Sequence, residues 1–135
     1  MDTTERSELN QSIKDALLLT KRAGVDDLVA WMETHGYFQC PASTRFHGVY
    51  EGGLVDHCVE DYSYLEKLNI ELSLGLEKDT VRIVAFLHDL CKVGKYISNN
   101  KGGYKTNNNH LKGHAMLSLE IIERFIELSE LEHKM

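Results

Sequence analysis

The sequence predicts an all-α fold, a helical bundle of about five helices with one long Gly/Asn-rich loop. Apolar residues recur at helical spacing in five segments, the chain of 135 residues contains one proline, and its glycines fall between those segments. A chain of this length corresponds to one domain and can bury a core without disulfide bonds. We therefore expect residues 1–135 to form a single domain.

The first two helices are expected at residues 5–22 and 26–35. In each, apolar residues recur three or four positions apart, as Ile13 and Leu17 do in the first. Gly24 separates the two segments and is a plausible stop for the first, because glycine adopts the left-handed conformation that often follows a helix. The sequence thus predicts two short amphipathic helices, and all candidate functional residues lie later in the chain.

The third helix is expected to open at Gly52-Gly53 and to run to about Asn69. The segment before it, 37–51, lacks helical period and contains the single proline, Pro41. That segment is predicted to be an ordered loop, because a proline inside a helix removes a hydrogen bond and clashes with the preceding turn.

The fourth helix is expected from Asp79 to Cys91, with Asp79 or Thr80 as its N-cap. Residues 92–112 are rich in glycine and asparagine, which favours a long loop, with or without a short hairpin. A last helix is expected to begin near Gly113 and to continue to the end of the chain.

Charge and cysteine usage exclude several classes of protein. The net charge of −6 disfavours a broad nucleic-acid-binding face. No run approaches the length of a membrane span, and the polar, acidic start does not resemble a secretory signal. Cys40, Cys58 and Cys91 are widely spaced, which argues against a disulfide framework and favours a reducing, cytoplasmic setting. Cys58 and Cys91 lie on apolar helix faces and are expected to be buried rather than to bind metal.

Three histidines, His57, His88 and His114, each lie on the apolar face of a different predicted helix, and Asp89 follows His88 directly. One such histidine is more often a packed core residue than a ligand. Buried imidazoles nevertheless need partners for both ring nitrogens, and one divalent cation can serve several of them. A His/Asp metal site is therefore predicted, and a set of simply packed histidines is its alternative.

The segment that joins two of these candidate ligands is cationic. Residues 90–119 contain no Asp or Glu, and they include five lysines, namely Lys92, Lys95, Lys101, Lys105 and Lys112. In an acidic protein, such a segment is consistent with an anionic substrate. A solvated loop with scattered lysines explains the same pattern, and both interpretations stay open.

Three segments carry a family resemblance. His88-Asp89, within Ala-Phe-Leu-His-Asp-Leu-Cys-Lys-Val, resembles the signature of the HD-domain metal-dependent phosphohydrolase superfamily, with Lys92 in its last place. Residues 45–57 are similar to the His-x-x-Tyr-x-Gly-Gly-Leu-x-x-His element of one branch, which contains small bacterial and phage HD proteins and the HD part of a 3′–5′ exoribonuclease type. Lys112-Gly-His114 resembles the Gly-His element of that branch.

The resemblance implies a metal-dependent phosphohydrolase. The substrate would be a phosphomonoester or phosphodiester, such as a nucleotide or a nucleic-acid end, and the cofactor a divalent metal ion (Mn, Fe, Ni, Co, Mg or Zn). The implied metal ligands are His57, His88, Asp89 and His114; the implied catalytic residues are Asp89 and Lys92; and the implied substrate-binding residues are Lys92, His47 and Arg45.

One feature departs from the family's pattern. The family usually completes its first metal shell with a later Asp, whereas this chain has no Asp after His114. Three explanations stay open. The chain lacks the C-terminal segment that carries the last ligand, or Asp61 or a water takes the place of that ligand, or the domain is inactive and binds a nucleotide or a protein partner.

Overall fold

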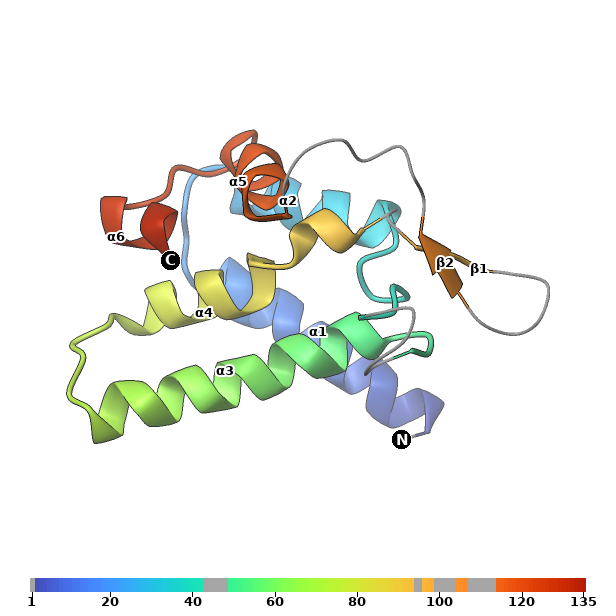
Figure 1. The fold of residues 1–135 in the computed structure, drawn as a ribbon, viewed down its shortest axis with the longest axis horizontal. Helices are drawn as coiled ribbons and strands as arrows, with labels where there is room; N and C mark the ends of the chain where they lie inside the picture. The colour runs from blue at the N-terminus through green and yellow to red at the C-terminus, as the bar shows by residue number, and fades with distance from the viewer. Residues whose placement is uncertain (1, 43–48, 94–95, 99–103, 107–113) are drawn as a thin grey trace.

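Six α-helices and a short hairpin make up the described part of the computed structural model (Figure 1), which confirms the predicted all-α class. The described residues are 2–42, 49–93, 96–98, 104–106 and 114–135, and for 96–98, 104–106 and 114–116 only the backbone is described. The helices are α1 (Thr3–Leu18), α2 (Val25–Thr34), α3 (Gly53–Glu71), α4 (Lys78–Leu87), α5 (His114–Glu123) and α6 (Glu130–Lys134), with a 3-10 turn, η1 (Leu90–Lys92), after α4.

Helix α4 occupies the middle of the bundle. It packs along α3 on one side, while α5 and α6 lie on the other side (Figure 1). Helix α4 carries apolar side chains on several faces, and Ile83, Phe86 and Leu87 are all buried. Leu54 of α3 and Met32 of α2 complete the same core with no exposed surface. The end of α4 is therefore held by packing from several helices, and this is where His88 and Asp89 occur.

Helix α1 is shorter than the sequence predicts. It ends at Leu18 and not near residue 22. The chain turns at once, because Lys21 adopts a positive φ of 54° and cannot continue a right-handed helix. Helix α4 begins at Lys78, after the N-cap Glu77, so the N-cap expected at Asp79 or Thr80 is wrong.

The predicted single last helix is also wrong, because it is divided into α5 and α6. Ser129 starts the second piece with a capping box, in which its side chain accepts a hydrogen bond from the backbone of Glu132 and the Glu132 side chain accepts one from Ser129. These two hydrogen bonds satisfy the backbone N–H groups of Ser129 and Glu132, which in a continuous helix would bond to carbonyls one turn earlier. The Ser-x-x-Glu spacing at 129–132 is a helix-start signal, although the apolar periodicity continues across it.

The long loop contains the hairpin that the sequence left open. Strand β1 (Tyr96–Ser98) pairs antiparallel with β2 (Tyr104–Thr106), with Ile97 opposite Lys105. None of the helices found in the described residues has both the length and the apolarity needed to cross a lipid bilayer.

Candidate metal centre

The junction between α4 and η1 sets the positions of His88 and Asp89. His88 caps the C-terminus of α4 in helical conformation, and Asp89 then departs from it, with φ −104° and ψ 20°. The backbone N–H of Cys91 donates to Ser118 Oγ on α5 at 3.0 Å, so the turn is tied to the neighbouring helix. This break directs the side chains of two consecutive residues toward α3.

Helix α3 supplies the other half of the site. His57 and Asp61 lie one turn apart on the same face, and the Nε2 atom of His57 is 3.1 Å from Asp61 Oδ2. That atom of His57 is also 3.1 Å from Asp89 Oδ2. On the facing side, His88 Nε2 lies 3.1 Å from Asp61 Oδ2 and 3.2 Å from Asp89 Oδ2. Two imidazoles and two carboxylates thus converge from two helices and a turn.

The Nε2 atom of His88 faces this cluster because its other ring nitrogen is already engaged. Nδ1 lies 3.0 Å from the carbonyl oxygen of Ala85, which can only accept a hydrogen bond. Nδ1 therefore carries a proton, and Nε2 is the nitrogen left to donate to the carboxylates when the ring is protonated or to bind a cation when the ring is neutral. A backbone carbonyl that orients a histidine in this way is a common feature of metal sites.

The spacing of the donor atoms fits a shared cation. Ligand atoms about 2.1 Å from one ion lie about 3.0 Å apart when they meet at a right angle, close to the separations of 3.1 and 3.2 Å found here. The ligand atoms of His57, Asp61 and His88 all lie within 4.8 Å of one another. Imidazole nitrogen with carboxylate oxygen suits Mn, Fe, Co, Ni or Zn better than Ca.

Without a cation, a proton would take its place. Burial lowers the pKa of His88, but the hydrogen bond from the ring to Asp89 and the charge of Asp89 outweigh burial, with smaller contributions from the Ala85 carbonyl and Asp61. The pKa of His88 is therefore raised above its ordinary value. The pocket of negative charge that favours an imidazolium is the same one that would favour a divalent ion.

Asp89 is the most buried member of the cluster, with 5% of its side chain exposed. The Nζ atom of Lys92 lies 3.5 Å from Asp89 Oδ2 and donates a hydrogen bond to the carbonyl oxygen of Ala42 at 2.8 Å. Lys92 therefore lies behind the carboxylate and links it to the loop before α3. The resemblance places Lys92 near a substrate phosphate, and in this structure its ammonium has two partners within the protein.

Three of the expected site residues fall outside what the structure describes. His114 is the first residue of α5, but its side chain is not described, and Arg45 and His47 lie in the undescribed segment 43–48. Their roles stay predictions. Asp61 is one of the alternatives that the sequence offers for the absent later Asp ligand. Its i,i+4 spacing from His57, which places both side chains on one helix face, is the feature of the sequence that points to it.

Helix α3 is buried near the site and exposed further along. Tyr64 and Leu68, which continue the helical spacing of His57 and Asp61, are 58% and 45% exposed, because α3 extends beyond the helices that cover it (Figure 1). Cys58 is completely buried, as expected. Burial raises the pKa of its thiol to about 12, so Cys58 remains a thiol and packs as a small apolar side chain.

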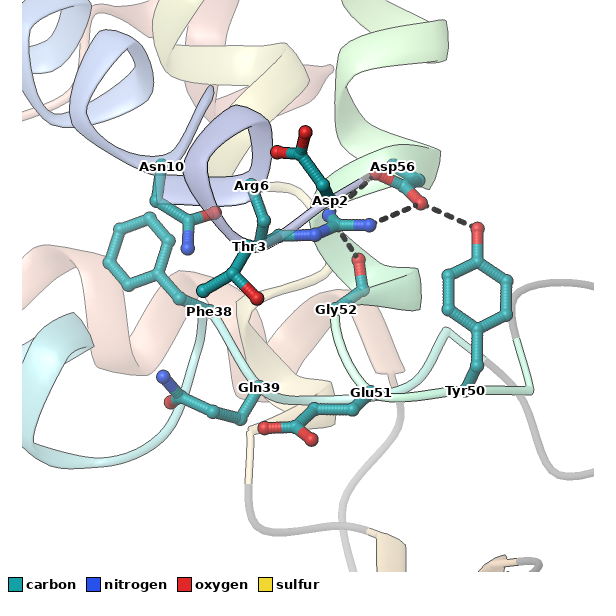
Figure 2. A pocket seen from close by; sticks show the side chains of 10 residues that line it. All are labelled: Asp2, Thr3, Arg6, Asn10, Phe38, Gln39, Tyr50, Glu51, Gly52 and Asp56. Carbon is teal, nitrogen blue, oxygen red and sulfur yellow. Dashed lines mark hydrogen bonds and ion pairs between the residues drawn. The ribbon is translucent and has the colours of Figure 1, made fainter. Parts of the chain in front are cut away.

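The first turn of α3 is anchored by a polar network beside a surface hollow of about 680 Å³ (Figure 2). Both oxygens of Asp56 accept hydrogen bonds from Arg6, at 2.7 and 3.0 Å, and one of them accepts another from Tyr50 at 2.6 Å. Figure 2 also shows Arg6 donating to the carbonyl of Gly52. The Arg6 hydrogen bond is the main reason that the pKa of Asp56 is lowered. Because Asp56 directly precedes His57, this network helps to hold the helix that carries the site.

Comparison with known proteins agrees with this geometry. The sequence profile described as "HD domain" matches residues 54–134, which is more than half of the chain and includes His57, Asp61, His88, Asp89 and Lys92. No curated protein and no solved structure matches the chain.

Proposed function

This chain belongs to the HD-domain family, and we propose that it is a metal-dependent phosphohydrolase that hydrolyses a phosphomonoester or phosphodiester at the cluster of His57, Asp61, His88 and Asp89. A nucleotide or a nucleic-acid end is the substrate class that the resemblance favours. Asp61 takes the place of the later Asp that the family usually supplies.

The convergence of two Nε2 atoms and two carboxylates supports this function most directly. His57 and His88 come from different helices, yet each lies 3.1 Å from the same oxygen of Asp61. A set of simply packed histidines would not need this arrangement, because one carbonyl or water would satisfy each ring separately.

Each residue of the site has a role in the proposed reaction. His57, His88, Asp61 and Asp89 would hold the ion, and Ala85 keeps His88 in the tautomer that can bind it. When bound, a divalent cation neutralises phosphoryl charge and lowers the pKa of a water molecule toward neutrality. A carboxylate of the site would accept the proton of the attacking water and, as the ester P–O bond breaks, return it to the departing alcohol oxygen. Lys92 stabilises the charge of the buried Asp89.

The experiment measures metal content and phosphoester hydrolysis on the same preparations. We expect about one or more equivalents of transition metal to bind the wild-type protein, with Mn²⁺-dependent release of phosphate from nucleotides or of alcohol from a phosphodiester. His88→Ala is expected to lose both properties. His35→Ala is the matched control, since His35 is an exposed histidine that caps the C-terminus of α2, stacks on Trp31 and is not part of the cluster.

The outcomes separate the candidate functions. Metal binding that disappears in His88→Ala, together with metal-dependent turnover, supports the hydrolase. Metal binding without turnover on any phosphoester would instead favour the inactive domain that binds a nucleotide or a protein partner. Equal metal uptake by the wild type and His88→Ala would overturn the site itself.

A further inference from the structure

A small apolar cleft adjoins the cluster on the side away from α3. Its walls are Ile83 and Val84 of α4, Leu119 and Ile122 of α5, and Leu128 before α6, and His88 lines one end of it. Val84 lies one turn before His88, which caps α4, and both residues line the cleft. His88 thus borders both the candidate metal centre and this cleft.

The charged side chains at the edge of the cleft are already paired. Glu132 accepts hydrogen bonds from Arg22, His133 Nδ1 lies 2.7 Å from Glu123, and Lys134 lies 3.1 Å from Glu130. The cleft therefore offers a ligand mostly apolar walls, with Ser118 also lining it, and His133 and Lys134 at its edge each lie next to a carboxylate. A second phosphate or another anionic group would gain little there, because nothing compensates for its desolvation.

The volume of the cleft, about 130 Å³, limits what can enter it. For comparison, an apolar cavity of about 150 Å³ engineered in another protein binds benzene. The cleft thus matches one six-membered ring or an aliphatic group of similar size.

We propose that this cleft between α4, α5 and α6 is a specificity subsite that binds the uncharged ring of a phosphoester while the phosphoryl group lies at the His57–His88 cluster. The inference rests on the proposed function and narrows it to esters whose alcohol carries an aromatic or apolar ring close to phosphate. Burial of such a ring against Leu119 and Ile122 favours binding by the hydrophobic effect.

The test compares benzyl phosphate with ethyl phosphate. Both esters release a primary alkoxide, so their leaving groups are similar and they differ mainly in the ring. We expect kcat/KM of the wild type to be at least about tenfold higher for benzyl phosphate. Leu119→Lys places a charge in the cleft and should bring the ratio close to one, with ethyl phosphate turned over within about twofold of the wild type. Leu72→Lys, at a position 63% exposed and outside the cleft, should preserve the ratio.

A binding measurement keeps this inference distinct from the hydrolase proposal. Metal-free protein with labelled methyl groups is titrated with benzyl alcohol, and the resonances of Leu119 and Ile122 are expected to shift, whether or not any ester is hydrolysed. Hydrolysis of both esters at equal efficiency, with no shift of those methyl groups, would overturn the subsite and leave the hydrolase intact. Shifts without turnover of either ester would show a ring-binding cleft that does not serve as a substrate subsite, and the hydrolase is then judged by its own test on nucleotides and phosphodiesters.

Discussion

The Oδ2 atom of Asp61 lies 3.1 Å from the Nε2 atom of His88, although the two residues belong to different helices. The same oxygen lies 3.1 Å from His57, one turn earlier in α3. Asp61 is thus the residue that bridges the two imidazoles from the more open side, with 35% of its side chain exposed against 5% for Asp89. This geometry makes Asp61 a ligand candidate that can replace a distant Asp.

Asp61→Asn is expected to weaken metal binding by at least about tenfold, because the amide is nearly the same size but lacks the charge that a divalent ion prefers. The fold should be unaffected, since Asp61 is partly exposed. The measurement is the dissociation constant for Mn²⁺ or Zn²⁺ by competition with a chelator. Asp27→Asn, an exposed change on α2, is the control, and equal affinity of the two variants would refute the ligand role of Asp61.

Lys92→Met is expected to destabilise the protein by about 2 kcal/mol, because it leaves the charge of Asp89 buried without its neighbouring cation and removes the hydrogen bond to Ala42. Added Mn²⁺ should restore part of this loss, since the ion would compensate the same carboxylate. The measurement is the free energy of unfolding in urea with and without metal. Unchanged stability with a reduced kcat/KM would show instead that Lys92 serves the substrate phosphate.

The sequence was most informative where one local pattern decided the outcome. The helical spacing that places His88 on an apolar face and the adjacency of Asp89 were enough to bring both to one site. The i,i+4 spacing of His57 and Asp61 was equally visible. Whether Asp61 reaches His88 depends on how α3 packs against α4. Neither segment of sequence, taken alone, predicts that packing.

The remaining differences have similar causes. The partner of Lys92 is a backbone carbonyl of the loop 37–42, whose path follows from the burial of Tyr37 and the hydrogen bond of its hydroxyl to Phe86. No spacing rule relates Lys92 to Ala42. The division into α5 and α6 was readable from the Ser129–Glu132 capping box, but apolar periodicity across the same residues favoured one continuous helix.

Glu132 is expected to make the stability of the protein depend on pH below about 4.5. Burial raises its pKa, but hydrogen bonds from Arg22, Ser129 and Thr80 outweigh that effect and lower the pKa to about 2. Because the folded pKa is below the unfolded one, the stabilisation is present above the unfolded pKa and is lost as the pH falls toward about 2.

The test compares unfolding free energies at pH 7 and pH 3 for the wild type and Glu132→Gln. The wild type should be more stable than the variant by on the order of 2 to 3 kcal/mol at pH 7, and the difference should shrink at pH 3. Glu130→Gln is the control in the same helix, since that carboxylate is exposed and pairs with Lys134 at the surface. A difference that stays constant with pH would contradict the low pKa of Glu132.

Gly24 joins the start of α2 to the segment that separates α5 from α6, and its replacement tests that contact. The residue has a φ of 89°, and a Cβ there would lie 1.9 Å from the carbonyl oxygen of Phe125. Gly75 has a similar φ of 72° but open space around it. Gly75→Ala should therefore cost about 1 kcal/mol from backbone strain alone, whereas Gly24→Ala should cost about 3 kcal/mol or more, because the backbone of Phe125 must also move. Urea unfolding of both variants measures the difference, and equal losses would show that the approach of Gly24 to Phe125 does not hold the two segments together.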